Sequence, residues 1–213
     1  MVIAGVTIEK KDEKKLKALG VKDSKQLSPR RREELAKVIE QVAKNIVVMR
    51  VQSCKIDSYR QRGINLDKIE AMKIAQIIDM SEGKVYVDSL EQNTKRFKAI
   101  IVSFLQNKKR DLIVENYMDE TVTVVGAASV IAKVERDRAI EEIKRRVNYD
   151  FGVGYSHDAR TIAFVEKLIK ENKELPPYVR KTWITTKLLQ EKSWQRRIKD
   201  FILGKKKECS EKE

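Results

Sequence analysis

Several residue types that support familiar kinds of site are scarce in this chain. Its 213 residues include one histidine, two cysteines and three prolines. Because His157 is the only histidine, a Ser-His-Asp or Cys-His mechanism would depend on that residue alone. Cys54 and Cys209 lie far apart with no Cys-x-x-Cys spacing, which argues against a disulfide framework and against a zinc site. This cysteine usage favours a reducing compartment, and we expect a cytoplasmic protein.

Long hydrophobic runs are absent as well. No stretch of about 18 consecutive apolar residues occurs, so we expect no membrane span. The apolar residues 1–6 have no basic flank and are too few for a secretory signal peptide. We therefore interpret them as the beginning of a buried strand.

Positive charge is what the chain has in excess. Lysine and arginine number 46 against 32 acidic residues, which gives a formal net charge of +14 at pH 7. Such an excess favours polyanionic partners, above all nucleic acid. A heat-adapted surface is the alternative, since charged residues make up 37% of the chain. That alternative accounts for the number of charges but not for their imbalance.

The hydrophobic pattern alternates between short strands and amphipathic helices. We expect strands at 2–8, 45–52, 84–87 and 112–115, and helices at 12–18, 28–42, 65–80, 94–105, 127–146, 161–172 and 179–203. This order predicts an α/β fold whose sheet is partly parallel. We expect one domain over residues 1–175 and, after Pro176-Pro177, a basic helical extension over residues 176–213.

Two acids stand where a strand ends and a helix is about to begin. Asp88 directly follows the strand at 84–87, and Asp119 lies a few residues beyond the strand at 112–115. The carboxyl ends of parallel strands meet at one edge of a sheet, so both side chains could share a divalent ion such as Mg²⁺. The alternative is that both are ordinary capping or turn residues, and spacing alone favours that alternative.

Other candidate residues lie in turns and at a helix start. The small residues Gly126 to Ser129 could admit a phosphate, or let a helix pack closely on the sheet, or both. Lys133 could bind the same phosphate or extend into solvent, and Lys25, in a turn, could meet another phosphate. Tyr155 lies in a glycine-rich loop, where it could stack on a sugar or base or could anchor the loop.

Six motifs, in order along nearly the whole chain, carry a family resemblance. They are VKDSKQLSPRRR at 21–32, VYVD at 85–88, GAASVIAKVERDR at 126–138, GVGY at 152–155, DART at 158–161 and PPYVRKTW at 176–183. With these motifs the chain resembles ribonuclease HII, the type 2 ribonuclease H, in its archaeal form. One such match would be weak, but six in register are a specific signal.

The resemblance implies an RNase H-like mixed sheet flanked by helices. It also implies endonucleolytic cutting of the RNA strand of RNA–DNA hybrids, including ribonucleotides embedded in DNA, with Mg²⁺ or Mn²⁺ held by four carboxylates. Asp88 matches the metal-binding aspartate after the fourth strand, Asp119 the last catalytic aspartate, and Tyr155 the tyrosine that stacks on a deoxyribose. The positions near the substrate phosphates are Lys25, Ser129 and Lys133.

The sequence departs from the family pattern at its beginning. The family opens with a central strand that ends in Asp-Glu-Ala-Gly-Arg-Gly, whereas residues 1–6 match the second strand. Two of the four carboxylates are therefore missing, and the nearby Asp12-Glu13 lies in a lysine-rich stretch and does not replace them. Either the start lies at an internal methionine of a longer protein, which we favour, or the chain is truncated and inactive.

For partners we expect a monomer that binds an RNA–DNA hybrid or ribonucleotide-containing duplex DNA, and no membrane. The rival function is a catalytically inactive hybrid-binding protein, for which the net charge and the basic residues 187–207 would suffice. A sliding clamp is a further conceivable partner, but no clamp-binding motif is recognisable in this basic tail.

Overall fold

The computed structural model describes residues 1–18, 20–21, 27–171 and 174–210, with the side chains of 197, 200 and 202–210 left aside. The chain forms two compact units. Unit 1 comprises residues 1–51 and 59–139, and unit 2 comprises residues 52–58 and 140–213. No helix among the described residues is long and apolar enough to cross a membrane.

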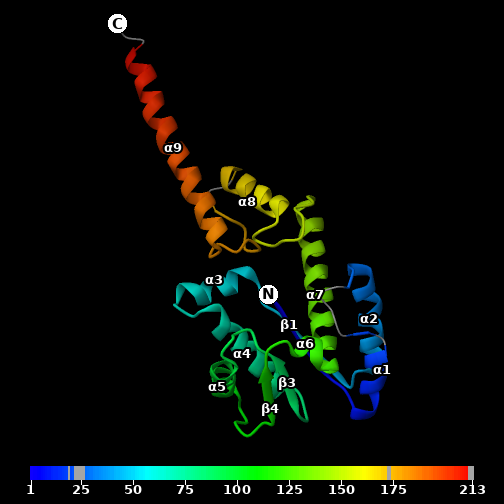
Figure 1. Cartoon of the computed structure of the whole chain (residues 1–213). Helices are drawn as coiled ribbons and strands as arrows, with labels where there is room; N and C mark the ends of the chain where they lie inside the picture. Colours follow the sequence, from blue (N-terminus) through cyan, green and yellow to red (C-terminus); the bar gives the residue numbers. More distant parts are fainter. Residues whose placement is uncertain (19, 22–26, 172–173, 211–213) are drawn as a thin grey trace. The chain divides into compact units, whose positions relative to one another are not determined.

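Unit 1 contains two small two-stranded sheets, one antiparallel and one parallel. Strand β1 (Val2–Thr7) pairs antiparallel with β2 (Asn45–Arg50), so that Val2 lies opposite Arg50. Strand β3 (Val85–Asp88) pairs parallel with β4 (Leu112–Glu115), as Figure 1 shows. The predicted mixed α/β arrangement is therefore confirmed, with each strand at or within two residues of its expected limits.

Some of the helices begin where the sequence supplies a capping residue. The helices are η1 (Lys10–Asp12), α1 (Glu13–Ala18), α2 (Pro29–Val42), α3 (Ser53–Gln61), α4 (Leu66–Asp79), α5 (Thr94–Phe104), α6 (Met118–Thr121), α7 (Thr123–Val147), α8 (Ala159–Glu171) and α9 (Ile184–Ser210). The Ser28 hydroxyl accepts a hydrogen bond from Arg31 N at 3.2 Å, with Pro29 at the first helical position. The Asn65 side chain caps α4 in the same way, through Lys68 N at 3.0 Å.

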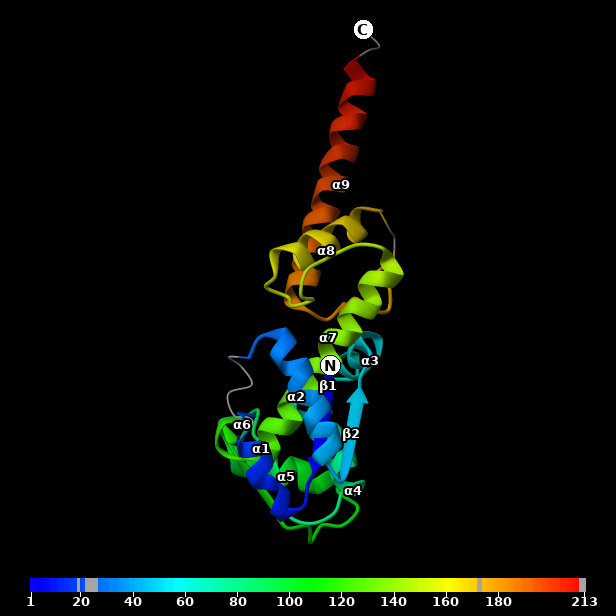
Figure 2. The same cartoon turned by 90° about the vertical axis from the view of Figure 1, so that its right-hand side faces the viewer.

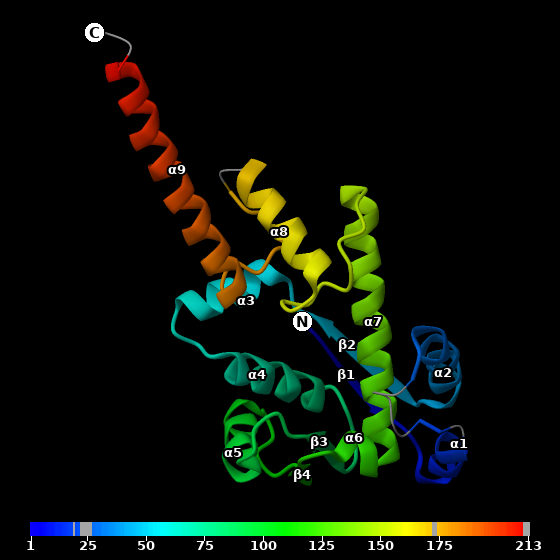
Figure 3. The same cartoon turned by 45° about the horizontal axis from the view of Figure 1, so that its top comes forward.

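Two apolar clusters hold unit 1 together. In the first, Leu16, Leu35 and Ile39 pack with α7 and against β1 and β2, and Figure 2 shows α2 and α7 beside these strands. In the second, Phe97 and Ile101 of α5 pack with α4, β3 and β4, which lie together in Figure 3. Each sheet is thus packed against its own set of helices, and this packing holds its strands in place.

Unit 2 has one apolar cluster of its own, in which Phe151 stacks on Phe164 with ring centroids 5.0 Å apart. The cluster takes in α8, Leu175, Val179 and Leu189 of α9. The boundary expected between residues 175 and 176 therefore falls inside unit 2.

Several helices differ from expectation. Helix α3 was not predicted, α7 begins at Thr123 rather than at residue 127, and α9 begins at Ile184 rather than at 179. The earlier start of α7 has a packing cause: Thr123 and Val125 are buried, and tertiary burial overrides the low helical propensity of β-branched residues.

Candidate metal and phosphate site

Asp88 ends β3 beside the end of β4. The Met118 N–H donates a hydrogen bond to Asp88 Oδ1 at 3.0 Å, and Ser89 N donates to Glu115 O at 2.8 Å. Tyr117 has φ 61°, a left-handed conformation that turns the chain from β4 into α6. The carboxylate of Asp88 is thereby held against the first residue of α6.

Asp119 is the next residue along α6. Its side chain is only 5% exposed, and it lies directly after the Met118 N–H that binds Asp88. The structure therefore brings the two predicted carboxylates to one place at the carboxyl end of the parallel strand pair. The described residues contain no cluster of three or more His, Cys, Asp or Glu side chains that could hold a metal.

Both aspartates line a cavity of about 890 Å³ within unit 1. Its walls come from β1, β3, α4 and the first half of α7, with apolar side chains that include Ile74, Ile77 and Val125. Among the described residues β1 pairs only with β2, and β3 only with β4, so the cavity lies between two strand edges without partners. Such edges offer backbone N–H and C=O groups to a further strand.

The two strands that border this cavity, β1 and β3, have a definite relative direction. Asn45 Nδ2 donates to Met80 O at 3.3 Å, and Lys44 pairs with Glu82 at 3.0 Å, so the end of β1 opposite Asn45 lies near the residues that precede β3. Strands β1 and β3 therefore run in opposite directions. A strand between them that is antiparallel to β1 would be parallel to β3 and would end on the side of Asp88.

Gly126 decides how closely α7 approaches Asp119. A Cβ at this position would lie 2.9 Å from the Asp119 carbonyl oxygen and 3.0 Å from that of Val21. Close packing thus accounts for the glycine, one of the two readings that its position allowed. Because α7 begins at Thr123, Gly126 to Ser129 do not form the start of the helix, and the expected helix start at these residues is wrong.

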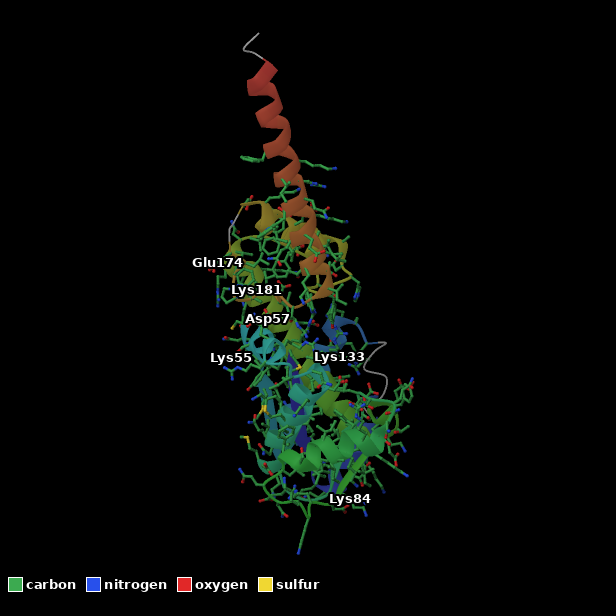
Figure 4. The ribbon with its side chains drawn as sticks, turned by 90° about the vertical axis from the view of Figure 1, so that its left-hand side faces the viewer. Lys55, Asp57, Lys84, Lys133, Glu174 and Lys181 are labelled. Carbon is green, nitrogen blue, oxygen red and sulfur yellow. The ribbon has the colours of Figure 1, made fainter. Side chains whose placement is uncertain are left out.

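The other predicted residues are placed differently. Ser129 lines the same cavity as Asp88 and Asp119. Lys133 follows one turn later on α7 and is half-buried (Figure 4). Tyr155 belongs to unit 2, whereas both aspartates belong to unit 1, and Lys25 lies outside the described residues.

The loop that carries Tyr155 is held by Asp158. The Asp158 carboxylate accepts hydrogen bonds from Val153 N at 2.7 Å and from Thr161 Oγ1 at 2.9 Å. The Val153 N–H bond in particular lowers the pKa of the Asp158 carboxyl. A Cβ on Gly152, whose φ is 83°, would collide with that carboxylate, so the turn requires glycine.

Asp57 is a buried carboxylate that the sequence did not single out. It is 4% exposed and accepts hydrogen bonds from Lys181 N at 2.8 Å, Thr182 N at 3.0 Å and Thr182 Oγ1 at 2.6 Å. Figure 4 shows Asp57 beside Lys181. Asp57 thereby links α3 to the segment before α9. The only feature of the sequence that could have indicated this role is the position of the acid next to Ile56, in a stretch that was not expected to be helical.

Comparisons with known proteins find relatives that match most of the chain. The model of the family described as Ribonuclease HII matches residues 1–186. A ribonuclease HII of Methanococcus maripaludis is 38% identical over 207 residues, which cover 95% of this chain and 85% of that protein. The crystal structure of ribonuclease H2 from Pyrococcus horikoshii OT3 aligns with TM-score 0.78 and 32% identity, covering 90% of this chain and 98% of that one. A structure of the PCNA:RNase HII complex from Archaeoglobus fulgidus aligns with TM-score 0.78 and 36% identity, covering 89% and 88%.

Proposed function

The chain belongs to the ribonuclease HII family, whose members are endoribonucleases of the type 2 ribonuclease H class, and we propose that it cuts RNA–DNA hybrids with a divalent cation held at Asp88 and Asp119. Single ribonucleotides embedded in duplex DNA belong to the proposed substrates. The observation that carries the proposal is that both carboxylates line one cavity, where Asp88 accepts a hydrogen bond from the N–H of Met118, the residue next to Asp119.

The donor set suits a hard cation. Mg²⁺ takes oxygen ligands and is usually bound by one or two carboxylates together with water and substrate phosphate oxygens. Asp88 and Asp119 supply such oxygens, and we propose Mg²⁺ or Mn²⁺ as the ion. When bound, this ion would polarise the phosphodiester and lower the pKa of a coordinated water.

The chain's own residues bind and orient the substrate. Asp119 is held by burial and by the packing of α7 on its backbone, so its position is set before substrate binds. The Ser129 hydroxyl and the Lys133 ammonium follow each other by one turn of α7, and we propose that both bind phosphate oxygens. Tyr155 is proposed to stack on the sugar beside the ribonucleotide.

Two further carboxylates are implied by the family resemblance, and we propose that an extended segment in the cavity between β1 and β3 supplies them. The strand edges provide hydrogen-bonding groups along both sides, and the apolar walls suit small apolar side chains. A segment parallel to β3 would present its last residues beside Asp88. An Asp-Glu pair there would complete a set of four.

A complementation experiment tests this proposal. The 213-residue chain alone is expected to bind a labelled hybrid but to cut it little in Mg²⁺. Addition of a strand-forming peptide that ends in Asp-Glu should raise cleavage, whereas a peptide ending in Asn-Gln should not. Robust Mg²⁺-dependent cutting by the chain alone would show that no further carboxylates are required and would refute this proposal.

Variants then separate an enzyme from a hybrid-binding protein. With the acidic peptide present, Asp88→Asn should abolish cleavage and leave hybrid affinity nearly unchanged. Asp111→Asn is the matched control, because Asp111 is an exposed acid next to β4 that pairs with Lys84 only at 3.9 Å. If no condition yields cleavage while the hybrid still binds, the inactive binding protein is the better description.

A sliding clamp is a further proposed partner. The sequence offered no motif for it, but the Archaeoglobus fulgidus relative is described in complex with PCNA. On α9, Trp194, Ile198 and Phe201 are 70%, 56% and 64% exposed and offer an apolar surface. Calorimetric titration of archaeal PCNA should detect binding that Trp194→Ala weakens, and the absence of any binding would exclude this partner.

A further inference from the structure

The loop between α7 and α8 holds two exposed aromatic side chains against each other. The rings of Tyr155 and His157 stack with centroids 5.5 Å apart and planes inclined by 9°. This geometry lies within the range in which aromatic pairs attract. Tyr155 is 48% exposed, and His157, the only histidine of the chain, is exposed too.

Hydrogen bonds fix the backbone on both sides of Tyr155. Gly154 N donates to Thr161 Oγ1 at 3.0 Å, and Asp158 N donates to Tyr155 O at 3.1 Å. Thr185 Oγ1 donates to the carbonyl of Ser156 at 3.3 Å. These hydrogen bonds set the position of the Tyr155 backbone, whereas the stacked His157 ring lies against the Tyr155 side chain itself.

We propose that His157 is a positioning residue that holds the Tyr155 ring in the orientation in which it stacks on a nucleotide sugar. The inference rests on the proposed role of Tyr155 and deepens it. A ring already held against a neighbour loses less rotational freedom when it meets substrate, which strengthens binding. An aromatic side chain at position 157 is needed for this, whereas the imidazole nitrogens are not.

Binding of the full chain to a fluorescent DNA duplex with one embedded ribonucleotide, followed by anisotropy, tests the proposal. His157→Ala and His157→Gln should both weaken binding about three- to ten-fold, the size of one stacking contact. His157→Phe should restore it, because the ring returns without its nitrogens. Tyr149→Ala, at another exposed tyrosine of unit 2 that stacks on Phe164 at 5.2 Å, is the control and should bind as the parent does.

The double variant decides between positioning and direct contact. If His157 acts only through Tyr155, then His157→Ala should add no loss in a Tyr155→Ala background. An equal further loss there, or failure of His157→Phe to restore binding, would show that His157 meets the substrate itself and would overturn the proposal. Unchanged binding of Tyr155→Ala would refute the role of Tyr155 and the inference together, whereas loss in Tyr155→Ala with none in His157→Ala would refute the inference alone.

Discussion

Replacement of Gly126 by alanine should destabilise unit 1, although helical propensity predicts the opposite. Alanine is favoured over glycine inside a helix by about 0.8–1 kcal/mol. Here, however, the new methyl group would lie 2.9 Å and 3.0 Å from two backbone carbonyl oxygens, of Asp119 and Val21. Neither oxygen belongs to a flexible side chain, so α7 or α6 must move.

The size of the effect follows from the two opposing contributions. Overpacking of a well-packed site costs about 1–3 kcal/mol, and the gain in propensity offsets about 1 kcal/mol of it. The free energy of unfolding should therefore fall by up to about 2 kcal/mol. Movement of α7 or α6 would also displace Asp119, which is a proposed ligand of the cation. The affinity for Mn²⁺ should therefore fall as well.

Chemical denaturation and Mn²⁺ titration calorimetry measure the two effects. Ala132→Gly, six residues further along the same helix and also lining the cavity, is the matched control. It should cost about 1 kcal/mol of stability through propensity while leaving the ion affinity unchanged. A Gly126→Ala protein more stable than the parent would refute the reasoning, since the contact would then carry no cost.

Three further predictions concern other parts of the chain. Asp57→Ala leaves the N–H groups of Lys181 and Thr182 without their acceptor and should destabilise unit 2 by about 1–3 kcal/mol in denaturant titrations. Asn65→Ala should cost about 1 kcal/mol through loss of the α4 cap, and Asn65→Ser should recover most of it. Burial raises the pKa of Glu135, but hydrogen bonds from Arg50 and Arg138 outweigh it, so the pKa lies below the ordinary 4.5. Its stabilisation is therefore complete above pH 4.5 and is lost as the pH falls through the lowered pKa, so Glu135→Gln should flatten the acid side of the stability profile.

The elements that local chemistry specifies were predictable. Ser28-Pro29 and Asn65 mark helix starts through bonds to residues three positions later, so the signal lies within one turn of sequence. The β-branched strands that precede Asp88 and Asp119 were predictable in the same way. Together with the family motifs, they indicated both aspartates as candidate site residues. Helix α3 was missed because its buried side consists only of Ile56 and Asp57, too little for a periodic pattern.

By itself the sequence determined the family, all four strands, most of the helices and the two acids of the candidate site, because motifs and periodicity are properties of neighbours along the chain. Only the tertiary structure decided that Asp57 binds residues 124 and 125 positions away, and that Gly126 is required by the backbone of Asp119 and Val21. It also showed that a cavity bounded by β1 and β3 adjoins Asp88. Such features depend on contacts between distant segments, whose positions follow from packing of the whole unit rather than from any local pattern.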